Sequence, residues 1–307
     1  MKKIAFMFPG QGSQYVGMGQ ELSQHHEVAR DLFDTANSIL GYDLTKVMFS
    51  GPMELLTQTQ YTQPAIFTMS CAITGILKEK GIVPEAVAGH SLGEYAAWVS
   101  SGVINFADGL KIVHIRGQLL QETAARQKGT MAAIIGLDNE KIKEICRAVK
   151  NGVVEPVNYN SPGQLVIAGQ EQAVHEAMAA AQQQGALKVI LLQVSGAFHS
   201  SLMKEAGVKL EQELARFTFK DPLVPIVANH NAKFIQNKDE AREAMIKQVS
   251  APVLWEQSMQ QLIASGIDTF LEIGPGKVLN GLLKRINRKI KGYNLENEKT
   301  LQEYFQL

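Results

Sequence analysis

The fold is decided by the stretch Val87-Ala88-Gly89-His90-Ser91-Leu92-Gly93-Glu94. It has the form G-x-S-x-G and lies between an apolar run, Val83–Ala88, and a run of helical composition, Leu92–Val99. Such a strand, turn and helix expose a serine hydroxyl at the edge of a sheet, with glycines that let neighbouring backbone come close. The motif occurs by chance in many chains, so its context matters. Here the context predicts an α/β fold with a nucleophile at Ser91, whose chemistry is acyl transfer.

The bulk composition is that of an ordinary globular protein. The chain has 307 residues, of which 45% are hydrophobic and 20% charged, and its formal net charge is zero. This length allows one large domain and a smaller one. The charge balance argues against nucleic acid as a partner, which would require a basic excess. Cys71 and Cys146 are predicted to be buried, reduced thiols rather than a disulfide or metal ligands.

The first ten residues resemble a signal peptide only briefly. Their apolar core ends at Pro9-Gly10, which is too short for a signal sequence and predicts a first strand instead. No stretch approaches the roughly 20 apolar residues of a membrane span. We therefore expect a cytoplasmic protein without membrane contact.

Residues 1 to 126 alternate short apolar runs with amphipathic helices, which predicts a parallel sheet covered on both faces. The predicted strands are Ile4–Phe8 and Val83–Ala88, and the predicted helices are Gly17–Glu27, Ala29–Leu40, Thr62–Glu79 and Phe106–Ala125. Pro64 would lie in the first turn of its helix, where proline is tolerated.

The middle of the chain follows a different order, β-α-β-β-α-β, which is typical of a ferredoxin-like unit. Its predicted elements are Thr130–Ile135, Asn139–Val149, Val153–Tyr159, Gln164–Ala168, Gln172–Gln184 and Leu187–Val194. We expect residues 127–195 to form a subdomain inserted into a large α/β-hydrolase-like domain made of residues 1–126 and 196–307. The second part of that domain would contain helices Leu202–Phe217, Ala241–Gln248, Leu254–Ser265 and Val278–Arg288 and strands Val224–Ala228 and Thr269–Ile273.

A serine nucleophile needs a base, and histidine is the usual one near neutral pH. His199 is the leading candidate because it follows a predicted strand within Ser195–Ser200, where small residues let the loop approach another surface. A capping or buried histidine is the alternative. His90 is expected to point away from Ser91, and His230, in an Asn-rich loop, is a weaker candidate. The remaining histidines, in helices or at a polar helix end, are His25, His26, His114 and His175.

Elbow hydrolases place an acid between the serine and the histidine to orient the imidazole. The candidates Asp138, Glu155 and Glu171 all fall in the predicted insertion, at the wrong end of its strands. An uncharged acceptor such as a backbone carbonyl is therefore the expected partner, which predicts a Ser-His dyad.

Seven short motifs together carry a resemblance over nearly the whole chain. They are Pro9-Gly10-Gln11-Gly12-Ser13-Gln14, Thr62-Gln63-Pro64-Ala65, Gly89-His90-Ser91-Leu92-Gly93-Glu94, Arg116-Gly117, Asn158-Tyr159-Asn160-Ser161-Pro162-Gly163-Gln164, Gly196-Ala197-Phe198-His199-Ser200 and Glu272-Ile273-Gly274-Pro275-Gly276. In this order they resemble the bacterial malonyl-CoA:acyl carrier protein transacylases of type II fatty-acid synthesis.

The resemblance implies Ser91 as nucleophile and His199 as general base. Gln11 and Leu92 would supply the backbone amides of an oxyanion hole. Gln248 falls where the family places the residue whose main-chain carbonyl holds the histidine, an alignment that rests on the run Pro252–Trp255.

Arg116 lies in an otherwise apolar helix segment, Ile112 to Leu120. From the residues alone, a snorkelling or structurally paired arginine is as good an interpretation as a binding residue. The resemblance implies that its guanidinium binds the malonyl carboxylate, a bidentate pairing that arginine favours. Gln63 and Asn160 are further implied substrate-binding residues.

The implied reaction is ping-pong transfer from malonyl-CoA, through a malonyl-serine, to the phosphopantetheine thiol of an acyl carrier protein, with no metal or bound cofactor. An acidic carrier protein would fit the basic run Lys284, Arg285, Arg288, Lys289 and Lys291, which is equally well a solvated helix face. The oligomeric state stays open, a monomer among the options. The alternatives are a serine esterase or thioesterase, a discrete acyltransferase of polyketide synthesis, and a non-catalytic carrier-protein docking module.

Overall fold

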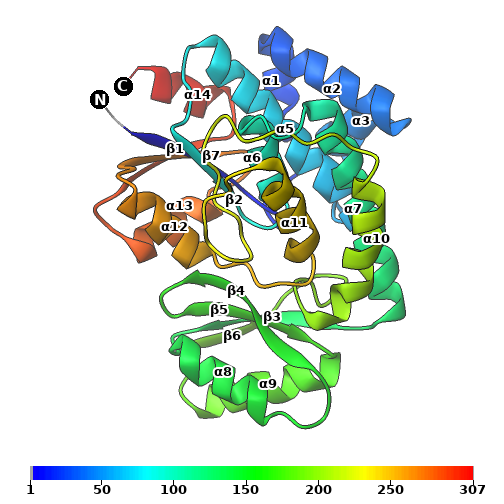
Figure 1. The fold of residues 1–307 in the computed structure, drawn as a ribbon, viewed down its shortest axis with the longest axis vertical. Coiled ribbons are helices and arrows are strands. Elements are labelled where there is room, and N and C mark those ends of the chain that lie inside the picture. Colours follow the sequence, from blue (N-terminus) through cyan, green and yellow to red (C-terminus); the bar gives the residue numbers. More distant parts are fainter. Residues whose placement is uncertain (1–2, 307) are drawn as a thin grey trace.

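The computed structural model describes residues 3–306 and contains two separate sheets (Figure 1). Residues 1, 2 and 307, at the outer ends of the predicted large domain, lie outside the described residues. The strands are β1 (Ile4–Phe8), β2 (Ala86–Gly89), β3 (Thr130–Ile135), β4 (Val154–Ser161), β5 (Gln164–Gly169), β6 (Lys188–Leu191), β7 (Thr269–Ile273) and β8 (Lys291–Leu295). One sheet is parallel and the other antiparallel, so the predicted α/β fold class is confirmed.

Helices surround both sheets. They are α1 (Gln20–His25), α2 (Glu27–Leu40), α3 (Leu44–Ser50), α4 (Met53–Leu56), α5 (Thr59–Glu79), α6 (Gly93–Ser100), α7 (Phe106–Arg126), α8 (Asn139–Ala148), α9 (Glu171–Gln183), α10 (Lys204–Leu214), α11 (Lys238–Gln248), α12 (Trp255–Ala264), α13 (Val278–Ile286) and α14 (Glu298–Phe305).

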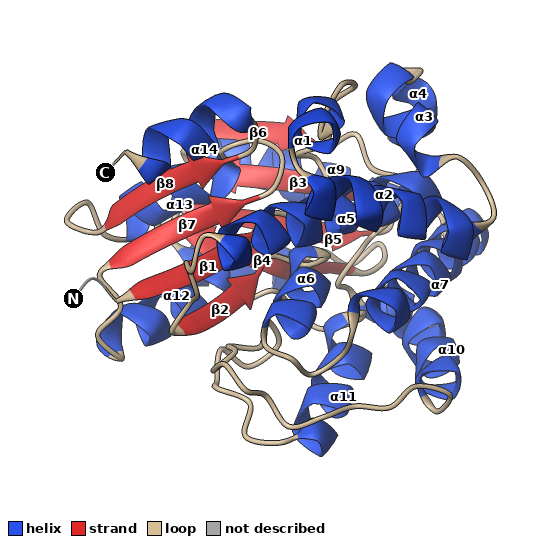
Figure 2. Cartoon of the chain, turned by 90° about the horizontal axis from the view of Figure 1, so that it is seen from above, coloured by secondary structure: helices blue, strands red, loops and turns tan. Residues whose placement is uncertain are grey.

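The parallel sheet has the strand order β2-β1-β7-β8 and is buried on both faces (Figure 2). Alternate side chains of β1 enter different cores, because successive residues of a strand point to opposite faces. Phe6 and Phe8 join the core that contains α2, α5 and α7. Ala5 and Met7 join the core that contains α12 and α13. A strand buried on both sides is apolar throughout, which is why this one was predictable.

The antiparallel sheet has the order β4-β5-β3-β6, which is the order of a ferredoxin-like unit. Ala132 and Ile134 of β3 face α8 and α9, whereas Met131 and Ala133 face the large core. Its edge strand β4 also touches the segment before α12, since Val253 donates its N–H to the carbonyl of Val157 at 2.7 Å. The next residue, Leu254, donates its N–H to the carbonyl of Asn229 at 2.9 Å, so this segment connects β4 to the loop that carries Asn229.

Several elements differ from the sequence predictions. Val224–Ala228 is not a strand: Ile226 makes only an isolated bridge with Val87, and Pro225 has no N–H to give to a ladder. The strand β8 (Lys291–Leu295) was not expected, nor were α3, α4 and α14. Helix α5 begins at Thr59 rather than Thr62, so Pro64 lies inside the helix and not in its first turn.

Candidate active site

The predicted elbow connects β2 to α6. Ser91 lies in the turn with a left-handed backbone, φ 52°, a conformation that strains a residue with a side chain. A Cβ on Gly93 would overlap the carbonyl of Phe8 in β1, and one on Gly89 would overlap the backbone of Gly93. Both glycines are therefore required by close approach of backbone. The result is a serine hydroxyl at the carboxyl end of the sheet, where α/β proteins bind ligands.

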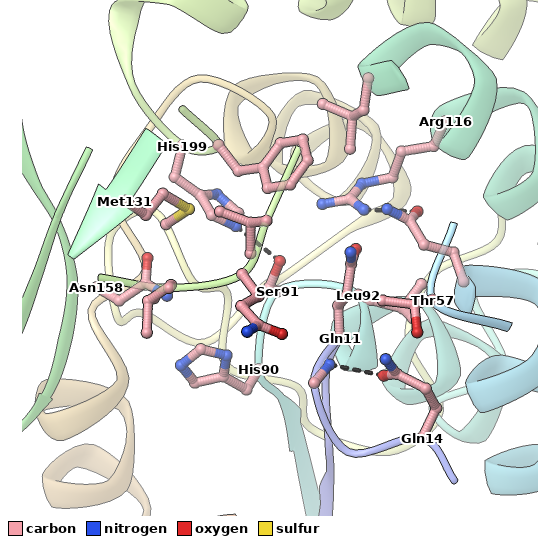
Figure 3. A pocket seen from close by; sticks show the side chains of 17 residues that line it. Gln11, Gln14, Thr57, His90, Ser91, Leu92, Arg116, Met131, Asn158 and His199 are labelled. Atoms are coloured by element: carbon pink, nitrogen blue, oxygen red, sulfur yellow. Dashed lines mark hydrogen bonds between the residues drawn. The ribbon is translucent and has the colours of Figure 1, made fainter. Parts of the chain in front are cut away.

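His199 follows the strands of the antiparallel sheet in the sequence, and the structure places its side chain beside Ser91 (Figure 3). Its Nε2 lies 2.6 Å from Ser91 Oγ. Its Nδ1 lies 2.8 Å from the main-chain carbonyl oxygen of Gln248, which can only accept. The proton therefore lies on Nδ1, and the lone pair of Nε2 faces the serine. This is the tautomer that a general base needs.

The position of a third triad member is occupied by the main-chain carbonyl of Gln248, an uncharged acceptor of the kind that the sequence analysis predicted. Glu155 accepts the N–H of Ser201 at 2.6 Å, and so holds the loop that carries His199 rather than its ring. Asp138 caps α8, and Glu171 lies in the first turn of α9. The carbonyl of Gln248 takes the place of the acid.

The environment of His199 favours its neutral form. The side chain is 4% exposed and, like Ser91, lies on left-handed backbone, with φ 64°. Burial, and then the positive charge of Arg116, lower the pKa of the imidazole to about 3, although the hydrogen bond to Gln248 opposes the shift. At neutral pH the ring is ready to accept a proton.

Gln11 and Leu92, the residues expected to supply amides to an oxyanion hole, both line the pocket that contains Ser91. Among the hydrogen bonds within residues 3–306, neither amide has an acceptor. Leu92 directly precedes α6, so its N–H belongs to the partial positive charge of a helix N-terminus. These are the open donors that an oxyanion hole requires.

Arg116 of α7 is 3% exposed and reaches the same pocket. Its Nη1 donates to Oε1 of Gln63 at 2.7 Å and its Nη2 to Oε1 of Gln248 at 3.1 Å. Its Nε has no partner among the described residues, and its guanidinium lies over the ring of Tyr95. Glu94 acts on it only at longer range. Among residues 3–306, this buried cation is held by neutral amides and has no carboxylate in contact.

The two asparagines of the motif in β4 have different surroundings. Oδ1 of Asn160 lies 2.8 Å from Nε2 of His90, whose ring packs on Trp255. His90 is therefore engaged away from Ser91, as expected. Asn160 is not among the residues that line the pocket, whereas Asn158 is, and its Oδ1 is buried without a partner among residues 3–306.

Three polar side chains behind the elbow connect these parts. Asn229 accepts the N–H of Ser91 at 2.8 Å, and Glu94 accepts the N–H of Asn229 at 2.9 Å. The side chain of Gln248 contacts Ser91, Glu94 and Arg116. The sequence analysis gave Asn229 no role and considered only the main chain of Gln248. The one local signal was that Asn229 directly follows an apolar run at the carboxyl end of the sheet.

The pocket is lined by residues of β3 and β4 and by residues that follow β1 and β2. Its lining is apolar beside Ser91 and His199. Its apolar lining consists of Leu92, Leu120, Met131, Leu192, Val194 and Phe198. Leu192 and Val194 follow β6, which is shorter than predicted. No group of three His, Cys, Asp or Glu side chains in the described part of the chain could hold a metal ion. None of the helices within residues 3–306 has the length and hydropathy to cross a bilayer.

A serine on an elbow, a histidine whose ring joins its hydroxyl to a main-chain carbonyl, and two amides without acceptors among residues 3–306 form the arrangement expected of the acyltransferase class. The acyl transferase domain family matches residues 5–297 of the chain. The chain is 43% identical over 304 residues to the malonyl CoA-acyl carrier protein transacylase of Bacillus subtilis, covering 98% of this chain and 96% of that protein. It is 46% identical over 288 residues to the protein of that name in Escherichia coli, covering 93% of each.

Solved structures agree with this relationship. An acyl carrier protein S-malonyltransferase from Vibrio cholerae has a TM-score of 0.95 at 42% identity, over 99% of this chain and 100% of that one. A malonyl-transacylase in complex with a type II polyketide acyl carrier protein has a TM-score of 0.97 at 41% identity, over 99% of each chain. The chain therefore belongs to the acyl transferase family and, within it, to the malonyl CoA-acyl carrier protein transacylases. The family predicted from the motifs is confirmed.

Proposed function

We propose that the protein transfers a malonyl group from malonyl-CoA, through an ester on Ser91, to the phosphopantetheine thiol of an acyl carrier protein. The observation that carries the proposal is the buried guanidinium of Arg116, which is held by the amides of Gln63 and Gln248 and has an unpartnered Nε. Such a group requires an anion. A malonyl carboxylate supplies one, and the names of the relatives point to the same acyl group.

In the first half-reaction, Nε2 of His199 takes the proton of Ser91 Oγ as the oxygen attacks the thioester carbonyl. The negative charge that develops on the carbonyl oxygen is stabilised by the amides of Gln11 and Leu92, each such donor being typically worth ~10²–10³ in rate. The C–S bond then breaks, and CoA leaves as a thiol with the proton from His199. In the second half-reaction His199 takes the proton of the carrier thiol, whose sulfur attacks the ester, and Ser91 Oγ recovers the proton.

The substrate carboxylate also affects the base. The charge of Arg116 contributes to the low pKa of His199 in the empty site. A malonyl carboxylate bound to Arg116 offsets that charge, so the basicity of His199 rises when the correct acyl group is present. An acetyl group leaves the guanidinium of Arg116 unpaired and His199 a weak base. Malonyl is therefore favoured both in binding and in activation of Ser91.

Further parts of the proposal follow from the same organisation. Residues 127–195, which contain the antiparallel sheet, form a subdomain inserted between the two parts of the catalytic domain, 1–126 and 196–307. The reaction uses the chain's own side chains without a bound cofactor, and it takes place in the cytoplasm. A serine esterase is disfavoured because the acid expected of an elbow hydrolase is replaced by the carbonyl of Gln248.

The test is transfer to acyl carrier protein from malonyl-, methylmalonyl- and acetyl-CoA, combined with intact-protein mass spectrometry. The wild-type chain should gain a malonyl group that persists until carrier protein is added. Ser91→Ala should gain none and should lose all measurable transfer. An adduct retained by Ser91→Ala, or rapid loss of the wild-type adduct to water, would contradict the proposal.

A further inference from the structure

Glu94 is a buried acid to which the reaction described above assigns no step. It lies in the first turn of α6, three residues after the nucleophile, and it is 0% exposed. Its Oε1 accepts the backbone N–H of Asn229 at 2.9 Å, and its Oε2 accepts Nε2 of Gln248 at 2.5 Å. An acid buried this deeply is costly unless both oxygens are satisfied, so these two contacts are what keep it in place.

Through Asn229, the first contact of Glu94 is connected to the backbone of the catalytic turn. Asn229, itself 0% exposed, uses Oδ1 to accept the N–H of Ser91 at 2.8 Å. Its Nδ2 donates to the carbonyl oxygen of Gly89 at 2.6 Å. The turn is strained at Ser91, and such a conformation persists only when the surroundings over-determine it. Asn229, fixed by Glu94, holds the peptide group before the nucleophile and the end of β2.

The second contact continues to the other side of the nucleophile and to the cation. Nε2 of Gln248 also donates to the carbonyl oxygen of Ser91 at 2.6 Å. Oε1 of the same side chain accepts from Arg116 at 3.1 Å, and its main-chain carbonyl holds His199. One glutamine therefore touches Ser91, His199 and Arg116, and Glu94 fixes the orientation of its amide.

A carboxyl group is what fits between these two neighbours: burial raises its pKa to about 8, and the hydrogen bonds from Asn229 and Gln248 oppose that shift. Both contacts bring an N–H to Glu94, so the side chain must accept at each of its oxygens. A glutamine at position 94 has one accepting oxygen and one donating NH2, which would face an N–H that cannot accept. If the amide of Gln248 turned over to meet it, its NH2 would face Arg116 instead. Either arrangement releases the nucleophile or the cation.

We propose that Glu94 is a positioning residue that holds Ser91 and Arg116 in one geometry, so that nucleophile attack and selection of the acyl carboxylate depend on it together. The inference rests on the proposed function and extends it. It makes two demands: replacing the carboxyl group of Glu94 should slow acylation by every donor, and it should slow acylation by malonyl-CoA more than by acetyl-CoA.

The test is the rate of Ser91 acylation in Glu94→Gln. This rate is measured by rapid mixing and intact-protein mass spectrometry. The final adduct amplitude counts the correctly folded sites, and each rate is given per such site. We expect the malonyl rate to fall about 10- to 100-fold, the magnitude typical of a small misplacement of reacting groups. The acetyl rate should fall less, so the malonyl-to-acetyl ratio should decrease. Loss of global stability alone would lower the amplitude and leave both rates and their ratio unchanged.

Asn229→Ala separates the two branches and serves if Glu94→Gln does not fold. Asn229 contacts Ser91 and Gly89 but not Arg116, so this variant should slow acylation by malonyl-CoA and acetyl-CoA by the same factor. A changed ratio in Asn229→Ala, or equal rates in wild type and Glu94→Gln, would overturn the inference.

The matched control is Glu272→Gln. Glu272 is also 0% exposed and also accepts two N–H groups, those of Leu279 and Asn280, but it does not line the pocket. Its acylation rates per folded site should equal those of the wild type. A wild-type chain that forms no malonyl adduct would contradict the proposed function itself, whereas an active wild type with an unaffected Glu94→Gln contradicts the positioning role alone.

Discussion

Two carboxyl ends of the parallel sheet, those of β2 and β7 on either side of β1, are built alike but differ in whether their polar groups are satisfied. Each strand passes through a glycine-containing turn into a helix, α6 or α13, and each junction has one fully buried glutamate. At the end of β7, Glu272 accepts the N–H groups of Leu279 and Asn280 at 2.9 and 2.8 Å. The chain's own carboxylate therefore occupies the amides at the start of α13.

At the end of β2, Glu94 does not bind the amides at the start of its helix. Glu94 lies behind the elbow, and the amide of Leu92 at the start of α6 is left without an acceptor in the described residues. Arg116 beside it is a cation without a carboxylate in contact. One junction satisfies its own polar groups and is structural. The other leaves an amide donor and a cation without partners beside a pocket. These unpartnered groups, rather than the strand–turn–helix form, make it a candidate site.

The largest effect is expected from removing the open charge. In Arg116→Ala, acylation of Ser91 by malonyl-CoA should fall about 10²- to 10³-fold, as is typical when one partner of a buried hydrogen-bonded charge pair is removed. Acylation by acetyl-CoA should not fall, because acetyl has no carboxylate to bind and because loss of the charge of Arg116 raises the pKa of His199. Adduct formation measured with both donors checks this, with Arg116→Lys as a variant that keeps the charge but loses the fork. Equal losses with both donors would show that Arg116 has only a structural role.

A smaller effect, on stability alone, is expected at the closed junction. Glu272→Gln replaces one accepting oxygen by a donor and leaves one N–H of α13 unsatisfied. The free energy of unfolding should fall by about 1–3 kcal/mol, the usual cost of an unsatisfied buried hydrogen-bonding group. Urea denaturation monitored by circular dichroism measures this change. An unaltered midpoint would mean that the two junctions differ less than their hydrogen bonds indicate.

The smallest expected effect concerns pH: the rate constant for Ser91 acylation should not change between pH 5 and pH 7. Because the pKa of His199 in the free protein is lowered to about 3, the ring stays neutral down to pH 5. An ordinary histidine, with a pKa near 6.5, would lose more than tenfold of its basic form between pH 7 and 5. The second-order rate constant for Ser91 acylation at low malonyl-CoA reports the free enzyme and should be flat over this range. A tenfold fall per unit below pH 6.5 would contradict the assignment.

Within the parallel sheet, β1 was predictable because both of its faces are apolar, whereas β8 was not. The strand β8 contains Lys291, Gly292 and Asn294 and lies at the edge of the sheet, so its composition is that of a loop. The run Val224–Ala228 is apolar enough for a strand, but Pro225 removes a donor, and the run makes only two isolated bridges, from Ile226 to Val87 and from Val227 to Phe234.

The candidate site was predictable to the extent that its residues lie in local motifs. Ser91 and His199 each lie in a turn of recognisable composition, and the structure brings them within hydrogen-bonding distance. The contacts of Glu94 with Asn229 and Gln248 span 135 and 154 residues, and no local pattern encodes them. The roles of all these residues stay predictions until the variants are measured.

Two irregularities in β4 explain why the asparagines there could not be assigned from alternation. The register of β4 against β5 shifts between Pro156 and Asn158 and again between Tyr159 and Ser161. A shift of this kind changes which side chains share a face. Asn158 consequently lines the pocket, whereas Asn160 binds His90.

The left-handed backbone at Ser91 and His199 has a consequence for how this protein can change over time. Each such residue stores roughly 1–3 kcal/mol of strain, which a glycine at the same position would relieve. Both members of the dyad carry that strain, at φ 52° and 64°. Selection for heat resistance alone would therefore favour mutations that destroy the enzyme. Only continued selection for turnover keeps a serine and a histidine where the backbone favours neither.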